Sequence, residues 1–196
     1  MFGGIHSDKT AVCRYHLSGH PGCKGIAGGQ GKGLIMIANE RIKIRINQLE
    51  MMYPDSFHEM SEEKKAGLVF YKDSPGACLE DPEHHIIVTV GWTKPGIMAM
   101  MLNEKEAAKA AEKKISRPMA ACGYHLEGFS DAVIGGAKAS GYRYHYHIQD
   151  TDMTGETLVV KYKKVFYYLN FYARTRLLEE SLKIWQSILD TIVFEE

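Results

Sequence analysis

The clearest alternation of apolar and polar side chains runs through residues 141–148. Tyrosines occupy every second position there, and arginine or histidine residues lie between them. Successive side chains of a β-strand point to opposite faces of a sheet, so this pattern predicts a strand with one aromatic and one basic face. Residues 157–163 alternate again after a turn-rich connection that contains Gly155, and they are predicted to form the hairpin partner.

Two further patterns complete the C-terminal third of the chain. Residues 165–173 are aromatic or apolar on both faces, which is typical of a strand that is covered on both sides. Beyond them, apolar residues recur at spacings of three and four, which predicts a closing amphipathic helix that lies across a sheet. This apolar stripe consists of Leu178, Leu182, Trp185, Ile188, Leu189 and Ile192.

The earlier part of the chain carries weaker strand and helix signals. Residues 41–47 alternate isoleucine with basic side chains, residues 84–92 are rich in β-branched side chains, and residues 124–134 form a weaker β-pattern. Each of these segments is predicted to be a strand.

Two helices are predicted from their terminal residues. Ser61 is the cap of a short helix with acids in its first turn and lysines in its last turn. Asn103, followed three residues later by Glu106, begins a longer helix with a small apolar face. Pro118 is expected to kink or interrupt this helix.

These elements predict a mostly antiparallel sheet layered with two longer helices and one short helix, an α+β fold. The chain has 196 residues, enough for one sizeable core, so residues 34–196 are predicted to form a single domain. Residues 1–33 are rich in glycine and lack a periodic apolar pattern. They are predicted to form an N-terminal extension.

The order of elements resembles the PsbP-like fold superfamily. The closest likeness lies in residues 135–139 and the strand that follows, in residues 165–169, and in the closing helix over residues 178–192. The resemblance extends over about residues 40–196 and implies a PsbP-like α/β/α sandwich. The superfamily includes the extrinsic photosystem II protein, a Ran-binding nuclear transport factor and uncharacterised bacterial relatives. It implies no catalytic signature, so no family site transfers residue by residue.

The charge balance narrows the classes of partner. The 24 basic and 24 acidic side chains cancel, which argues against a protein bound mainly to nucleic acid or anionic lipid, although local charged patches fit the same balance. The start of the chain lacks the apolar centre of a signal peptide. The four scattered cysteines do not suit a disulfide scaffold. We therefore expect a cytoplasmic protein with a protein partner, and neither nucleic acid nor a membrane.

A group of zinc-type ligands lies in the glycine-rich segment. Cys13, His16, His20 and Cys23 supply two thiols and two imidazoles, which Zn²⁺ binds tetrahedrally. A bound zinc ion would give this segment the core that it lacks. Known structural sites usually draw paired ligands from two separated elements, so a metal-free tail or a partner-contacting arm is the alternative interpretation.

A second candidate site lies on the basic face of the strand described first. Arg143, His145 and His147 share this face, and the hairpin is expected to place Lys161 or Lys163 beside them. This would give a basic surface patch, or a histidine pair that binds a metal or an anion. A polar outer sheet face without such a role is favoured, because no carboxylate is expected in the same register to orient an imidazole.

The sequence favours binding over catalysis. No serine, cysteine or aspartate lies in a nucleophile motif with a placed base. We therefore expect a non-enzymatic protein-binding or assembly module. The alternative is a metal-dependent hydrolase or a metal-binding protein that uses His145, His147 and an acid from elsewhere. The two-faced apolar segment 165–173 also needs cover, which predicts a homodimer.

Overall fold

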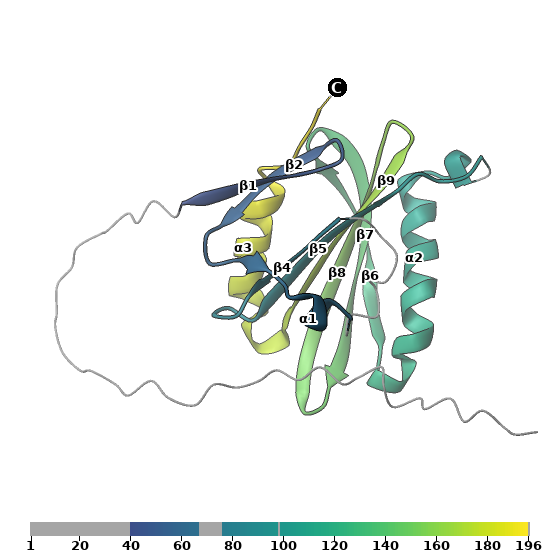
Figure 1. Ribbon diagram of the computed structural model, residues 1–196. Helices are drawn as coiled ribbons and strands as arrows, with labels where there is room; N and C mark the ends of the chain where they lie inside the picture. The colour runs from purple at the N-terminus through teal and green to yellow at the C-terminus, as the bar shows by residue number, and fades with distance from the viewer. Residues whose placement is uncertain (1–39, 67–75, 98, 196) are drawn as a thin grey trace, which may run out of the picture.

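The computed structural model describes residues 40–66, 76–97 and 99–195 (Figure 1). Cys13, His16, His20 and Cys23 lie outside these residues, so the zinc site remains a prediction. The same holds for the glycine-rich extension. The elements are, in chain order, β1 (Arg41–Ile46), β2 (Leu49–Pro54), β3 (His58–Glu59), α1 (Glu62–Ala66), β4 (Gly76–Asp81), β5 (Ile86–Thr93), η2 (Ala99–Met101), α2 (Glu104–Met119), η3 (Ala120–Cys122), β6 (His125–Ile134), β7 (Ala137–Ile148), β8 (Thr151–Tyr162), β9 (Val165–Arg174), η4 (Thr175–Leu177), α3 (Leu178–Leu189) and β10 (Val193–Phe194).

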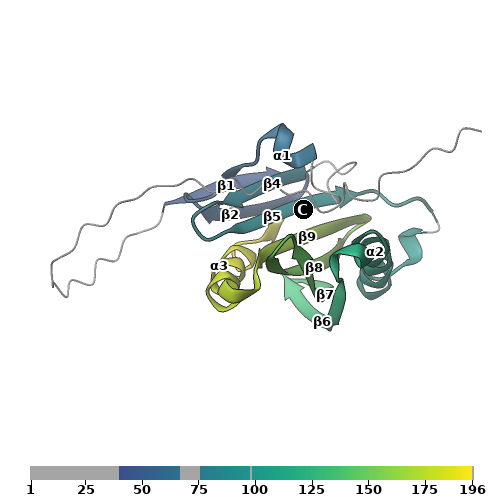
Figure 2. The same cartoon turned by 90° about the horizontal axis from the view of Figure 1, so that it is seen from below.

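The main sheet has seven strands in the order β3-β4-β5-β9-β8-β7-β6, and each neighbouring pair is antiparallel. A smaller antiparallel sheet has the order β1-β2-β10. Helix α2 packs against β7 and β8, and α3 packs against β9 and β2. The two helices lie on opposite faces of the main sheet (Figure 2). The predicted α+β class and its layering of helix, sheet and helix are therefore confirmed.

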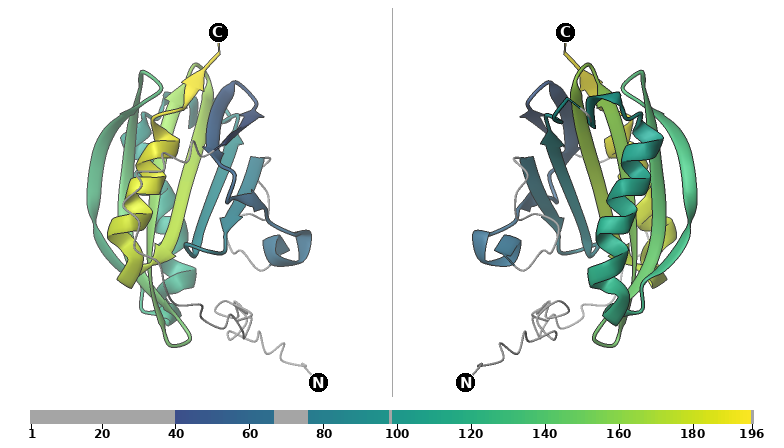
Figure 3. Two further views of the ribbon diagram at one scale, coloured as in Figure 1. Left: turned by 90° about the vertical axis from the view of Figure 1, so that its left-hand side faces the viewer. Right: turned by 90° about the vertical axis from the view of Figure 1, so that its right-hand side faces the viewer.

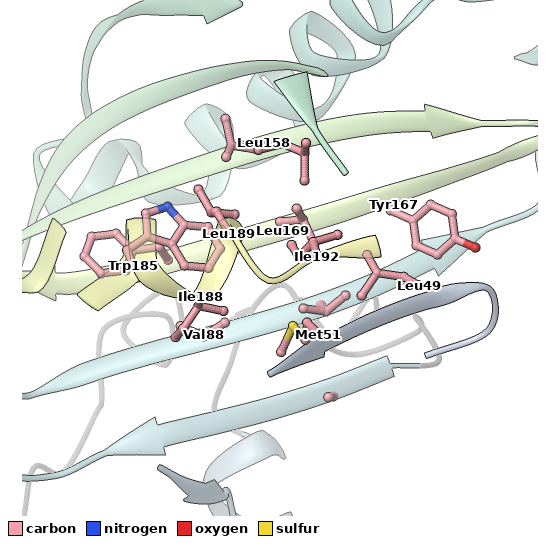
Figure 4. Close-up of a cluster of buried hydrophobic side chains, with 14 of the residues drawn as sticks. Leu49, Met51, Val88, Leu158, Tyr167, Leu169, Trp185, Ile188, Leu189 and Ile192 are labelled. Atoms are coloured by element: carbon pink, nitrogen blue, oxygen red, sulfur yellow. The ribbon is translucent and has the colours of Figure 1, made fainter. Parts of the chain in front are cut away.

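The larger core lies between α3, the small sheet and the main sheet (Figure 4). Trp185 is its largest fully buried side chain, and its ring stacks on Phe171 with the centroids 5.6 Å apart. Ile188 of α3, Val88 of β5 and Met51 of β2 belong to the same cluster. Burial of the apolar stripe on α3 is thus what holds this helix across the sheet.

The second core lies under α2. Tyr142 and Tyr144 of β7 are fully buried there, together with the small side chains Ala107 and Ala108 of α2. Small side chains allow the helix to lie close to the aromatic face of the sheet. Gly155 contributes to this packing, because a Cβ at that position would lie 2.4 Å from Cζ of Tyr144. The aromatic face of β7 is therefore core, as its alternation predicts.

The structure confirms most predicted elements and adds four strands. The Asn103 cap is observed in both directions: its side chain accepts from the backbone N–H of Glu106 at 2.8 Å, and Glu106 accepts from the Asn103 N–H at 3.0 Å. Strands β2, β3, β4 and β10 were not predicted from the sequence. Strand β2 was missed because the chain turns back after β1 at Asn47, which adopts a positive φ of 57° without a glycine to mark the turn.

Candidate functional site

A row of polar side chains lies on the face of the main sheet that α3 covers. Figure 3, left, shows this face of the sheet with α3 in front of it. We call this row the polar strip. Strands β6, β7 and β8 each contribute to it. Its members are His125, Glu127, Arg143, His145, His147, Asp152, Thr154 and Glu156.

Arg143 and Glu156 form the best-enclosed ion pair of the strip. They lie opposite each other on β7 and β8, and Arg143 Nη2 donates to Glu156 Oε1 at 3.0 Å. The other carboxylate oxygen, Oε2, accepts from the indole N–H of Trp185 at 2.8 Å. The Glu156 side chain is only 12% exposed, so the pair is partly shielded from water. Glu156 therefore connects the strip to α3 and the core.

His145 is held from two sides. Its Nδ1 lies 3.0 Å from the Thr154 hydroxyl, and its Nε2 lies 3.2 Å from Glu127 Oε2. Thr154 is fully buried, and its hydroxyl lies 2.9 Å from that of Thr175. These contacts fix the orientation of the imidazole, the role that carboxylates and hydroxyls often serve for functional histidines.

Glu127 reaches this position through a β-bulge. The register of β6 against β7 shifts between Leu126 and Gly128, which makes Glu127 the extra residue. Bulges bend a strand and re-aim a side chain. Here the carboxylate of Glu127 approaches His145 at 3.2 Å and Nη1 of Arg143 at 3.9 Å.

His147 forms a separate pair at the exposed end of the strip. Its Nδ1 lies 2.6 Å from Asp152 Oδ1, and both side chains are mostly exposed. The imidazole packs over Gly123, where a Cβ would lie 2.7 Å from His147 Cδ2. Gly123 also has a φ of 68°, so both its backbone and its lack of a side chain suit this position.

The structure corrects the sequence-based description of this face. The expectation that no carboxylate shares its register is wrong, because Glu127, Asp152 and Glu156 pair with His145, His147 and Arg143, respectively. The acids of β8 were missed because that strand was predicted to begin at Thr157, whereas it begins at Thr151. Extending the alternation back through Asp152, Thr154 and Glu156 would have revealed them.

The two predicted lysines lie elsewhere, so the expectation that they flank the histidines is wrong. Lys161 lies on the α2 side of the sheet, where its Nζ donates to the backbone oxygens of Met100 at 2.7 Å and Leu102 at 2.6 Å. Lys163 lies in the turn after β8, with its Nζ 5.3 Å from the centroid of the Tyr162 ring. The residue of β8 opposite Arg143 is Glu156. Lys161 lies five residues further along the strand, so its side chain points to the other face of the sheet.

A second histidine–carboxylate pair lies at the turn between β4 and β5. Asp81 is buried; its Oδ1 accepts from the backbone N–H of His84 at 3.1 Å, and its Oδ2 lies 2.7 Å from His84 Nδ1 and accepts from the Ser56 hydroxyl at 2.9 Å. Burial alone would raise the pKa of Asp81, but the hydrogen bonds from His84 and Ser56 outweigh it and lower the pKa below its usual value. Ser56 donates to the Asp81 carboxylate and not to the His84 imidazole, so the three residues do not line up as a nucleophile and its base. Their hydrogen bonds all converge on Asp81 and stabilise the turn.

Over residues 40–66, 76–97 and 99–195, no three histidine, cysteine or acidic side chains converge as metal ligands. Within the same ranges, no helix combines the length and apolar character needed to span a bilayer. The polar strip thus offers oriented charges and imidazoles to an incoming molecule without a preformed metal cage.

Comparisons with known proteins identify the fold. No protein-family model matches the chain, and no curated protein matches it in sequence. Among solved structures, cyanobacterial PsbP from Synechocystis sp. PCC 6803 matches with a TM-score of 0.61 and 9% identity over 87% of this chain and 98% of that chain. The protein has a PsbP-like fold.

Two further matches support this PsbP-like fold. LpqN of Mycobacterium tuberculosis, described as involved in cell envelope biogenesis, matches with a TM-score of 0.54 and 14% identity over 80% of this chain and 91% of that chain. The Ran-binding protein Mog1p of Saccharomyces cerevisiae matches with a TM-score of 0.51 and 6% identity over 80% of this chain and 96% of that chain. At such low identities the likeness concerns the fold alone.

Proposed function

We propose that this PsbP-like chain is a non-enzymatic protein-binding or assembly module whose recognition surface includes the polar strip. The observation that carries the proposal is the row of paired charges beside α3, which is exposed at the His147–Asp152 end and tied to the core through Glu156 and Trp185. Preorganised charges of both signs favour recognition of a complementary protein surface, because they set orientation and specificity.

The structural neighbours support the same function class. Mog1p is described as a Ran-binding protein, and the same layered fold therefore carries protein recognition in at least that case. A cytoplasmic location and a homodimeric state are finer parts of this proposal. The homodimer was predicted because both apolar faces of residues 165–173 need cover. That argument is lost, since β9 lies between β5 and β8 and its side chains enter both cores of the same chain.

Site-specific photo-crosslinking in the source cells tests the binding function. A photo-crosslinking residue in place of the exposed His125 is expected to give an adduct of discrete mass with one partner protein. The matched position is the exposed Lys183 on α3, which is expected to give none. Adding Glu127→Lys should remove the adduct, because it places a like charge beside Arg143. An adduct of unchanged yield in that variant, or none from His125, would contradict the proposal.

The alternative is a metal-dependent hydrolase or a metal-binding protein. One observation favours it: His145 and His147 share one sheet face, and each has a carboxylate beside it. Metal analysis of the purified full chain separates the two functions. Stoichiometric metal that is lost in His145→Ala but kept in Cys13→Ser would favour the alternative, whereas the binding module predicts no metal that depends on His145.

A further inference from the structure

The outer face of α2 carries a row of like charges. Lys105, Lys109, Lys113 and Arg117 are exposed and follow one another at intervals of four residues. We call this row the basic ridge. Four residues of α-helix rise about 6 Å, so the ridge presents a positive charge roughly every 6 Å over about 18 Å.

The ridge is unfavourable for the helix on its own. Like charges four residues apart repel each other on a helix surface. The four residues of the ridge form three such pairs in succession. Lys105 lies 3.6 Å from Asp131, but none of Lys109, Lys113 and Arg117 forms an ion pair with a described carboxylate. Glu106 and Glu112 lie three residues before and after Lys109 and offset part of the repulsion there. Lys113 and Arg117 have no acid three or four residues away on the helix, so their charges are the least balanced of the ridge.

An exposed apolar tip lies next to the N-terminal end of the ridge. Ile97 is 83% exposed and Met101 is 86% exposed, although large apolar side chains usually find cover. The segment η2, which carries Met101, projects beside the start of α2 (Figure 1). Lys161 fixes this segment through the backbone oxygens of Met100 and Leu102. The tip is therefore held in place rather than loosely attached.

The shape of the charged region favours a narrow partner over a flat anionic surface. On the side of the helix toward β6, carboxylates lie close to the ridge: Asp131 is 70% exposed, and Glu112 accepts a hydrogen bond from Tyr124. A flat anionic surface would meet these acids together with the ridge. A narrow partner such as a single helix can contact Lys109, Lys113 and Arg117 without covering Asp131, which lies beside Lys105, and the exposed Ala110 next to the ridge has only a small side chain.

From these observations we infer that the basic ridge and the tip form a docking surface for an acidic helical segment of a partner protein. Carboxylates at every fourth position of that segment match the repeat of the ridge, and an apolar side chain near its end covers Ile97 and Met101. This inference rests on the proposed protein-binding function and identifies the chemistry of one partner.

The test uses the full chain and two synthetic helical peptides in fluorescence anisotropy. The probe peptide has glutamate at every fourth position and a leucine near one end, and the matched peptide has glutamine in place of glutamate. The acidic peptide is expected to bind at least about tenfold more tightly than its glutamine counterpart, and its binding should weaken as salt screens the charges.

Two variants locate the binding on α2. Lys109→Gln with Lys113→Gln should weaken binding at least about fivefold, whereas Lys43→Gln with Lys183→Gln makes the same charge change on β1 and α3 and should leave it unchanged. Ile97→Ser with Met101→Ser should also weaken it. All of these side chains are exposed, and circular dichroism checks that each variant is folded.

Three results would overturn the inference: equal affinity for both peptides, full affinity in the ridge variant, or binding only to vesicles rich in phosphatidylserine. The crosslinking from His125 distinguishes this failure from failure of the proposed function. If the His125 adduct forms while the peptide does not bind, only the docking surface on α2 is wrong. If neither is seen, the binding function is wrong as well.

Discussion

Some single side chains in this protein are buried themselves but hydrogen-bond to groups nearer the surface. Asp81 is an example: it is buried, yet it accepts hydrogen bonds from the backbone and the side chain of His84 and from Ser56. The carboxylate satisfies the polar groups of the turn between β4 and β5. Its removal would leave part-buried donors without their acceptor, which costs more than the loss of a fully exposed hydrogen bond.

We therefore predict that Asp81→Asn lowers the free energy of unfolding by about 1–3 kcal/mol at neutral pH. The pKa of Asp81 is lowered in the folded protein, so its charge contributes stability above the pKa of the unfolded chain, near ~3.9, and loses that contribution as the pH falls through the folded pKa. Urea unfolding of both proteins from pH 7 to acid checks this. A difference that stays constant down to the lowest pH would contradict it.

At the level of elements, α3 is held mainly by its buried stripe. Trp185 lies at the centre of that stripe and stacks on Phe171. Trp185→Ala is predicted to cost about 3–5 kcal/mol of unfolding free energy, as large aromatic truncations in cores do. Trp185→Phe is the matched variant: it keeps much of the apolar contact, loses the hydrogen bond to Glu156, and should cost less. A near-native melting temperature of Trp185→Ala would show that α3 is not docked this way.

The start of α2 depends on a reciprocal cap. Asn103→Ala removes the acceptor for the Glu106 N–H, and the expected loss is about 1 kcal/mol. Asn103→Asp should keep most of the stability, because a carboxylate also accepts at a helix N-terminus. Thermal unfolding followed by circular dichroism measures both. Equal loss in the two variants would mean that the cap is not the cause.

The sequence was informative wherever one face of an element is buried. Tyr142 and Tyr144 predicted which face of β7 is buried, and the apolar stripe around Trp185 predicted α3. In both elements the buried face requires apolar side chains at a regular spacing, which is visible in the sequence. The pairing of Arg143 with Glu156 and of His145 with Glu127 could not be predicted in the same way. The first depends on where β8 begins, and the second on a bulge at Glu127, and neither alters the apolar pattern.

At the scale of the whole molecule, the predicted zinc site and homodimer remain to be measured. If Cys13, His16, His20 and Cys23 bind zinc, chelation should release about one metal ion per chain and leave the far-ultraviolet signal of the sheet intact. Retention of the metal in Cys13→Ser with Cys23→Ser would contradict this site.

Light scattering at high protein concentration measures the oligomeric state. The homodimer prediction expects twice the mass of the 22.1 kDa chain. A monomer mass at the highest concentration would contradict it.

The hydrogen bond from Trp185 to Glu156 should affect the fluorescence of this tryptophan. The chain contains two tryptophans, and in a Trp92→Phe variant the remaining indole would emit from beside a carboxylate whose other oxygen binds Arg143. A molecule that drew Arg143 away would change the charge next to that indole and should thereby shift the wavelength of its emission. The fluorescence of Trp185 in that variant would then report on occupancy of the polar strip.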